Sequence, residues 1–338
     1  MAACVPSLTE GELLASRRRR RLRARSAAPE DASSVVPSAA AAATARNDQR
    51  ERICRLDSFK RLKQIGEGAF GTVSKARDRR TGVVVAIKSA RYRSREAAAA
   101  LLREAALLAA CAGNPAVVAL RLVALSESGG LHLVMDFVGP SLHDLIGARR
   151  RRGIRFTELE ARRAMAPLLS GAASMHAHGI VHRDLKPGNV LVGEHDRRLK
   201  ICDLGLARST AAPPLDAQLE GTIGYIAPES LLCDKECSAP VDMWALGCIM
   251  AELVGGEQLF PEEDEYTQLV SIVDLLGIPD NVSLMPLGID AGAPSKLREK
   301  VPEERLSPAG FDVLHGLLQY DPKDRLTAVA ALQMPWFT

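Results

Sequence analysis

His182-Arg183-Asp184-Leu185-Lys186-Pro187-Gly188-Asn189 carries more information about this chain than any other part of its sequence. It follows the apolar, β-branched pair Ile180-Val181 and places Asp184 and Asn189 five residues apart, with Lys186 between them. A carboxylate can accept the proton of an attacking hydroxyl, an ammonium can meet the charge of a moving phosphoryl group, and an amide oxygen can hold a metal ion. The segment therefore predicts a catalytic loop for phosphoryl transfer.

The composition is that of an ordinary globular protein. Of 338 residues, 47% are hydrophobic and 25% are charged, and the formal net charge of +3 argues against a general polyanion binder. The seven cysteines form no CxxC or Cys/His pattern, which predicts reduced thiols in the cytosol or nucleus and no zinc site. No stretch approaches the roughly 18 to 20 uninterrupted apolar residues of a membrane helix, so we expect no membrane partner.

Residues 1–58 contain no Phe, Tyr or Trp, and they include an Arg run and an Ala run. Without large apolar side chains a segment cannot offset the entropy of folding, so we expect a disordered basic extension. Seven Arg within residues 17–25 indicate a nuclear-import signal, a nucleic-acid tether, part of an organelle transit peptide or a solvated tail. Glu10 and Glu12 weaken the transit hypothesis. We expect a nuclear or cytoplasmic protein, with the nucleus favoured, that contacts nucleic acid only through this run.

From Phe59 onward the pattern becomes β-rich and later helical. Apolar residues and turns predict five strands, at residues 59–65, 72–78, 83–89, 117–125 and 131–137. A helix over 94–112 interrupts them and stops at Gly113-Asn114-Pro115. The prediction is an α+β fold with a small β-rich lobe at 59–138 and a larger helical lobe at 139–337.

A glycine-rich segment of the pattern G-x-G-x-x-G-x-V joins the first two predicted strands. It consists of Ile65, Gly66, Glu67, Gly68, Ala69, Phe70, Gly71, Thr72 and Val73. Dinucleotide folds use similar glycines, but a helix follows them there, whereas a strand follows here. The segment favours a hairpin whose backbone N–H groups approach nucleotide phosphates, and a plain Gly-rich hairpin is the alternative.

Lys88 ends the apolar strand Val85-Ala86-Ile87-Lys88, where an unpaired ammonium would be costly to bury. One face of the following helix is apolar and carries Ala97, Leu101, Leu108 and Cys111. Glu104 lies on this face and is the expected partner of Lys88. Glu96 competes, but the helix dipole accounts for an acid near the helix start. A solvated Lys88 at the strand end is the alternative.

Two further acids follow the catalytic segment. Asp203 succeeds an apolar strand and heads Asp203-Leu204-Gly205, which suits a carboxylate that holds Mg²⁺ against phosphates. Asp242 opens an apolar helix, so we expect it to be buried and to accept hydrogen bonds from the catalytic loop backbone. Downstream, Arg325 is expected to pair with Glu229 of Ala227-Pro228-Glu229.

With these motifs in this order, residues 59–337 resemble a eukaryotic serine/threonine protein kinase domain. The resemblance implies protein substrates with Ser or Thr, and ATP and Mg²⁺ as cofactors. Asp184 would be the catalytic base and Lys186 a phosphate-facing cation, while Asn189 and Asp203 would bind Mg²⁺. Lys88, paired with Glu104, would contact the α- and β-phosphates.

The resemblance also implies where ATP binds. The Asp136 carbonyl and the Val138 amide would bind adenine, with Met135 at the back of the pocket. Three apolar residues would pack around the base, namely Val73, Ala86 and Leu191. The glycine-rich segment at 65–73 would cover the phosphates.

Within kinases, the C-terminal half is similar to the cyclin-dependent group. The similarity is carried by Val241-Asp242-Met243-Trp244-Ala245-Leu246-Gly247, Leu259-Phe260-Pro261, Leu275–Asp280 and Tyr320-Asp321-Pro322. Phe137–Leu142 resembles the plant F-group of these kinases. The helix that carries a PSTAIRE-type cyclin contact in the group instead reads Ala98–Glu104 here, so dependence on a cyclin is left open.

The chain departs from the group in its regulatory positions. Ala69 and Phe70 replace a Thr-Tyr pair and carry no hydroxyl that could be phosphorylated. Ala217 occupies the usual activating threonine position, so no phosphate can form there to pair with Arg183. The nearest upstream hydroxyls and the acids that could supply a constant negative charge are Ser209, Thr210, Asp216 and Glu220.

Two more substitutions concern substrate and metal. Ile226 replaces the Arg before Ala227-Pro228-Glu229, and Gly221 lies at the substrate +1 pocket, so a preference for a following proline is left open. Leu204 replaces the Phe of D-F-G with another apolar residue, which need not disturb Asp203. An active kinase is the favoured hypothesis, and a pseudokinase scaffold is the alternative. A small-molecule phosphotransferase is disfavoured because the segment at 221–229 builds a peptide-binding shelf.

Overall fold

The computed structural model describes residues 54–68, 71–92, 94–212, 220–232, 238–277 and 294–338. The chain divides into two units, residues 1–52 and residues 53–338, and the described residues belong to the second. The disorder expected for the basic extension therefore concerns mostly positions outside the described residues. No helix in the described ranges is long and apolar enough to cross a membrane.

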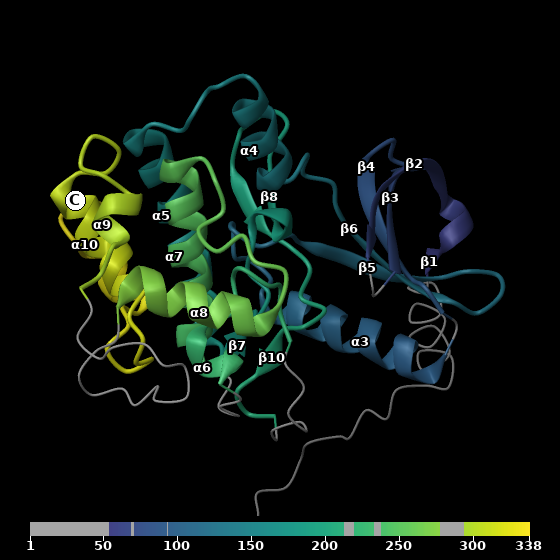
Figure 1. The fold of residues 1–338 in the computed structure, drawn as a ribbon. Coiled ribbons are helices and arrows are strands. Elements are labelled where there is room, and N and C mark those ends of the chain that lie inside the picture. Colours follow the sequence, from purple (N-terminus) through teal and green to yellow (C-terminus); the bar gives the residue numbers. More distant parts are fainter. Residues whose placement is uncertain (1–53, 69–70, 93, 213–219, 233–237, 278–293) are drawn as a thin grey trace, which may run out of the picture. The chain divides into compact units, whose positions relative to one another are not determined.

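A six-stranded sheet forms the small lobe, with strand order β1-β5-β6-β4-β3-β2 (Figure 1). Its strands are β1 (Cys54–Arg55), β2 (Phe59–Gly68), β3 (Gly71–Asp78), β4 (Val84–Ala90), β5 (Leu120–Leu125) and β6 (Leu131–Asp136). Strand β1 is parallel to β5, and all other neighbours are antiparallel. The glycine-rich segment is thus the β2–β3 hairpin, since Gly68 pairs with Gly71.

The sheet begins earlier than the sequence predicted. Strand β1 and the 3₁₀ turn η1 (Leu56–Ser58) both precede Phe59, which had been expected to open the folded domain. Residues 54–58, which the sequence placed in the extension, therefore belong to the folded unit. Strand β1 joins β5 through backbone pairing, which leaves no trace in an apolar or aromatic pattern.

Helix α3 (Arg95–Ala110) is the one helix of the small lobe among the described residues, and it packs on β4, β5 and β6. The Ser94 side chain caps it by accepting a hydrogen bond from the Ala97 amide at 3.1 Å. Its buried face consists of Leu101, Glu104, Ala105 and Leu108. The predicted helix over 94–112 is confirmed, with its ends trimmed by the cap and by the turn at Cys111.

The segment after α3 departs from the prediction. A strand was expected over 117–125, but β5 starts only at Leu120. Val117 and Val118 are buried against the large lobe instead: the Val118 amide donates to the Ile201 carbonyl at 2.9 Å, and the Ile201 amide donates to Ala116 at 2.7 Å. The strand prediction is therefore confirmed for residues 120–125, whereas Val117 bridges to Ile201 of β9 (Leu199–Ile201) rather than to the sheet.

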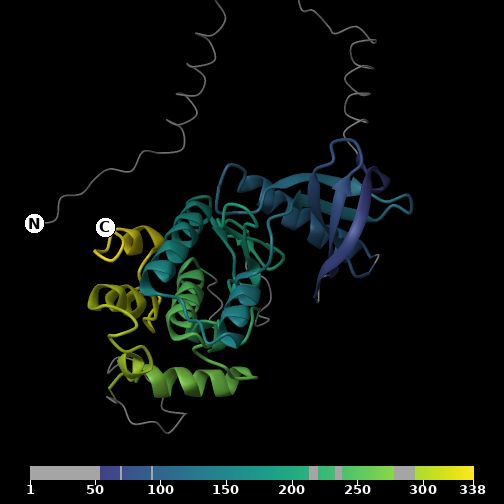
Figure 2. The ribbon, with the colours of Figure 1, turned by 90° about the horizontal axis from the view of Figure 1, so that it is seen from above.

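The large lobe is mainly helical, and Figure 2 shows its green and yellow helices apart from the purple and blue strands. Its helices are α4 (Leu142–Arg151), α5 (Glu158–Ala177), α6 (Pro228–Leu231), α7 (Pro240–Gly255), α8 (Glu265–Leu276), α9 (Leu297–Lys300), α10 (Pro308–Leu317) and α11 (Ala328–Leu332). Residues 241–254 of α7 are all buried, as an all-round apolar helix requires. The α+β fold with a β-rich and a helical lobe is confirmed.

Two two-stranded sheets and a turn of the large lobe carry the catalytic segments. Strand β7 (Ile180–Val181) pairs with β10 (Arg208–Ser209), and β8 (Val190–Val192) pairs with β9. A 3₁₀ turn, η2 (Pro187–Asn189), lies between β7 and β8. Residues 182–189 follow β7, and Asp203 follows shortly after β9. Because both strands are anchored in the core, they fix the positions at which the catalytic segments begin.

Candidate active site

A cleft of about 830 Å³ lies between the small-lobe sheet and the catalytic segments. Twelve of the residues predicted to bind the nucleotide line it, namely Ile65, Gly66, Glu67, Gly68, Gly71, Val73, Ala86, Lys88, Met135, Asp136, Val138 and Leu191. Thr72 does not line it, because neighbouring side chains on a strand point to opposite faces and Val73 faces the cleft. Ala69 and Phe70 lie outside the described residues.

The cleft also has lining residues that the sequence analysis missed. Lys75 lies over the Phe137 ring at 3.7 Å and forms an ion pair with Glu194 at 3.7 Å. Lys75 could have been found, because it shares the strand face of Val73 two residues away. Val118 and Cys202 also line the cleft, but they reach it through long-range packing that has no local signal.

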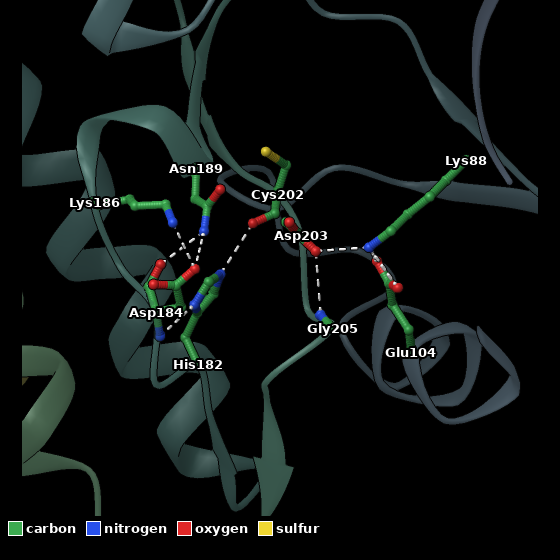
Figure 3. A network of polar contacts seen from close by, with 9 residues as sticks. All are labelled: Lys88, Glu104, His182, Asp184, Lys186, Asn189, Cys202, Asp203 and Gly205. Carbon is green, nitrogen blue, oxygen red and sulfur yellow. Dashed lines mark hydrogen bonds and ion pairs between the residues drawn. The ribbon is translucent and has the colours of Figure 1, made fainter. Parts of the chain in front are cut away.

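Lys88 is the centre of a charged cluster on the small-lobe side (Figure 3). Its Nζ lies 2.7 Å from Glu104 Oε2 and 2.7 Å from Asp203 Oδ1, and its side chain is only 6% exposed. Burial alone would lower the pKa of Lys88, but the Asp203 and Glu104 carboxylates shift it above its usual value. The side chain therefore stays an ammonium, and the ion pair with Glu104 forms as its spacing on the helix indicated.

Asp203 lies at the same point of the cleft. Burial would raise its pKa, but the Lys88 ammonium outweighs this and holds the pKa below its usual range. Asp203 has a φ of 62°, a left-handed conformation that is costly for a residue with a side chain. This conformation turns a carboxylate at the end of β9 toward Lys88, where the Gly205 amide donates to it at 3.4 Å.

Asp184 is the centre of a second cluster. Asn189 Nδ2 donates to its backbone oxygen at 2.8 Å and to Oδ2 at 2.9 Å, and Lys186 Nζ lies 2.9 Å from Oδ2. The Thr222 hydroxyl donates to Asp184 Oδ1 at 2.6 Å and accepts from Lys186 Nζ. The structure thus brings Asp184, Lys186 and Asn189 together, and it adds Thr222, which the sequence had placed only in the peptide shelf.

His182 joins the two clusters. Its Nδ1 accepts from the Asp184 amide at 3.3 Å, so the ring proton is on Nε2, which donates to the Cys202 carbonyl at 3.0 Å. His182 is fully buried, so it fixes the catalytic loop against the residue before Asp203. The sequence analysis gave His182 no role, because its partner lies twenty residues away.

Asp242 of α7 binds the backbone of the same catalytic loop. Its Oδ2 accepts from the His182 amide and its Oδ1 from the Arg183 amide, both at 2.8 Å, as predicted for a buried acid at this helix start. Burial would raise the pKa of Asp242, but its hydrogen bond from His176 and the nearby donors lower it. Arg183, with a φ of 70°, is therefore held in a strained conformation by two fixed hydrogen bonds.

The predicted peptide shelf at 221–229, together with Glu220 before it and called the peptide shelf from here on, is held at its C-terminal end by an ion pair. Arg325 Nη1 and Nη2 donate to the two Glu229 carboxylate oxygens at 2.7 and 2.9 Å, and Arg325 is only 4% exposed. This bidentate pair was predicted and is confirmed. Gln268 of α8, fully buried, accepts from the Gly224 amide and donates to the Ile226 carbonyl, which the sequence analysis did not find.

The oxygen atoms near Asp203 fit a magnesium ion. Because Asn189 directs its Nδ2 at Asp184, its Oδ1 is left for another partner, and Asp203 Oδ1 is shared with Lys88. Mg²⁺ is usually bound by one or two protein oxygen ligands together with substrate phosphates. No group of three or more His, Cys, Asp or Glu that could hold a metal occurs among the described residues, so phosphates would complete the shell.

Comparisons with known proteins agree with this geometry. The family model described as the protein kinase domain matches residues 59–337. A protein of Oryza sativa subsp. japonica named "Putative cyclin-dependent kinase F-2" is 46% identical over 301 residues, which cover 84% of this chain and 90% of that protein. This relative agrees with the resemblance of residues 137–142 to the plant F-group.

Two further relatives carry related names. Cyclin-dependent kinase B2-1 of Arabidopsis thaliana is 38% identical over 84% of this chain and 95% of its own length. Cyclin-dependent kinase G-2 of Oryza sativa subsp. japonica is also 38% identical, but only 42% of its length is covered. The chain therefore belongs to the protein kinase family, as a cyclin-dependent kinase-like serine/threonine kinase.

Proposed function

We propose that the chain is a catalytically active kinase that transfers the γ-phosphoryl group of ATP to Ser or Thr of proteins. One observation carries the proposal: Lys88 contacts Glu104 and Asp203 at the same time, at 2.7 to 2.8 Å. A kinase needs both the strand-helix ion pair and the metal-binding acid in place before it can transfer a phosphoryl group. Burial of the ammonium by itself would require only the pair with Glu104, and the contact with Asp203 goes beyond it.

The two clusters divide the reaction between them. The Asp184 carboxylate accepts the proton of the substrate hydroxyl as that oxygen attacks the γ-phosphorus, and the bond to the β-phosphate oxygen breaks to release ADP. Lys186 is placed to meet negative charge near the attacking oxygen, and Thr222 orients both side chains. Lys88 lines the same cleft and would contact the α- and β-phosphates.

Mg²⁺ would be held by Asn189 Oδ1 and the Asp203 carboxylate, and when bound it would neutralise charge on the phosphates. The chain's own contribution is to hold these oxygens still. Asn189 is fixed by two hydrogen bonds to Asp184, and Asp203 is fixed by Lys88 and Gly205.

The experiment that tests the proposal is phosphoryl transfer by the purified full chain. Wild type and Asp184→Asn are incubated with labelled ATP, Mg²⁺ or Mn²⁺ and an arrayed library of Ser- and Thr-containing peptides. We expect transfer by the wild type alone, and the array reports the +1 preference that Ile226 leaves open. Equal signals from both proteins would overturn the proposal and favour a pseudokinase scaffold.

We also propose that no cyclin is needed to seat α3. In the chain alone, Glu104 is already buried and paired with Lys88, and Leu102 on the outer face is 49% exposed. Relatives with cyclin-dependent names support the kinase assignment, whereas the sequence of α3 lacks the PSTAIRE-type contact.

We further propose that the chain is nuclear, on the basis of the seven Arg within residues 17–25. The run lies outside the described residues, so only its charge supports the proposal. A fluorescent fusion of the full chain is compared with a variant in which the seven Arg are replaced by Gln. Unchanged nuclear accumulation of the variant would contradict it, and salt-sensitive retention on nucleic acid would favour a tether.

A further inference from the structure

An ion pair joins the peptide shelf to the catalytic loop beside Asp184. Arg183 Nη1 lies 2.7 Å from Glu220 Oε2, with side-chain exposures of 12% and 28%. The same guanidinium nitrogen also reaches the Leu206 carbonyl at 3.5 Å. A cation this deeply buried needs an anionic partner, and the sequence itself supplies one.

The contact is one of several between residues 220–222 of the peptide shelf and residues 183–184 of the catalytic loop. Glu220 faces Arg183, and Thr222 donates to Asp184 at 2.6 Å. Between them Gly221 adopts a φ of 130°, where an added Cβ would lie 3.3 Å from the Arg183 carbonyl oxygen. Three consecutive shelf residues therefore lie against two consecutive residues of the catalytic loop.

Arg183 is a rigid attachment point for the shelf. Its amide is bound by the buried Asp242 carboxylate, and its backbone is held in the left-handed region. A partner of its guanidinium is thereby placed relative to Asp184, the next residue. A phosphate cannot serve at Ala217, which has no hydroxyl.

We propose that Glu220 is a positioning residue that holds the peptide shelf against the catalytic loop in the unphosphorylated chain. Its carboxylate takes the place of an activating phosphate, so the shelf is in register from the time the chain folds. The inference rests on the proposed kinase function, because its consequence for catalysis requires one. It adds a residue and a mode of regulation to that function.

The test uses the full chain, treated with phosphatase until mass spectrometry detects no phosphate. Glu220→Gln, Arg183→Gln and the double variant are compared with wild type, and Glu299→Gln, an exposed glutamate on α9, is the matched control. Steady-state kinetics give kcat and the KM values for peptide and ATP. Urea unfolding of the wild type, the two single variants and the double variant gives a double-mutant cycle that needs no activity.

We expect the unphosphorylated wild type to be active and Glu220→Gln to lower kcat/KM for the peptide by about 10- to 100-fold. KM for ATP should change little, because the ATP cleft does not include Glu220. The double variant should lose no more than either single one, and Glu220→Asp should recover part of the activity. A merely structural role would not separate the two KM values.

Unchanged peptide kinetics in Glu220→Gln, or additive losses in the double variant, would overturn the proposal. So would a wild type that phosphatase inactivates and that regains activity when Ser209 or Thr210 is phosphorylated. If wild type and Asp184→Asn are equally inactive, the proposed function fails separately. The double-mutant cycle of unfolding free energies then still tests whether Glu220 and Arg183 interact. Non-additive free-energy changes support the ion pair, and additive changes contradict it.

Discussion

The Thr222 hydroxyl donates a hydrogen bond to Asp184 Oδ1 at 2.6 Å while it accepts one from the Lys186 ammonium. A residue of the peptide shelf thus bridges the carboxylate and the cation that the proposed reaction uses. Thr222→Val keeps the shape and removes the hydroxyl, so we expect kcat to fall by roughly 10- to 100-fold. Thr222→Ser retains the hydroxyl and should stay within about threefold of wild type in the same steady-state assay. Loss of activity in Thr222→Ser with activity retained in Thr222→Val would show that the methyl group matters rather than the hydrogen bonds.

Lys88→Met should lower phosphoryl transfer by more than about 100-fold, because positioning and charge stabilisation supply most of the catalysis of this reaction. The substitution removes the ammonium that both Glu104 and Asp203 contact. Initial rates with a peptide substrate measure the effect. Lys60→Met, at an exposed position of β2, is the control for removal of a lysine charge. Retained activity in Lys88→Met would mean that another lysine contacts the phosphates.

The purified chain should be active without a cyclin. Helix α3 already places Glu104 in contact with Lys88. A cyclin is therefore not needed to bring the helix into this position. Activity is measured before and after addition of a mixture of purified cyclins. A rise of less than about threefold is expected, whereas a rise above about 100-fold would show that α3 needs an external partner.

The stability of the large lobe should depend on Glu160 at acid pH. A hydrogen bond from Arg149 lowers the pKa of Glu160 from 4.5 to about 2, and the Thr157 amide at the start of α5 adds to the shift. A depressed pKa contributes stability that is full above the unfolded value and is lost as pH falls through the folded value. Glu160→Gln should therefore flatten the decline of unfolding free energy between pH 4.5 and about 2.

The measurement for Glu160 is urea unfolding at a series of pH values. The half-exposed pair is screened by solvent, so the expected difference is small and only its pH dependence is diagnostic. Glu299→Gln, whose carboxylate is exposed on α9, should reproduce the wild-type curve. A variant curve parallel to the wild type would contradict the assignment.

The elements with a regular pattern were predictable from the sequence. Glu104 and Lys88 lie on a helix face and at a strand end whose periodicities are strong, so their ion pair followed from spacing alone. Glu229 and Arg325 formed their pair as well, although they are 96 residues apart. Lys88 and Glu104 each lie in an apolar segment, where a charge needs a partner.

Contacts that depend on how separate loops meet could not be predicted in the same way. Thr222 is 38 residues from Asp184, and nothing in the local pattern aligns the two. Glu220 was only one of two candidate acids, because spacing along a loop does not say which side chain turns toward Arg183. Strand β1 and the turn of Val117-Val118 toward β9 likewise arise from backbone pairing between distant segments.

The attachment of residues 114–118 to the large lobe has a mechanical consequence for α3. Asn114 donates to the Gly171 carbonyl of α5, and Val118 is paired with Ile201 two residues before Asp203. The C-terminal end of α3 is therefore fixed to β9, which ends two residues before Asp203, while its N-terminal end has exposed residues. A movement that separates Glu104 from Lys88 would therefore be a rotation of α3 about its C-terminal end. The distance that Glu104 travels would then be set by its position along the helix, ten residues from Asn114.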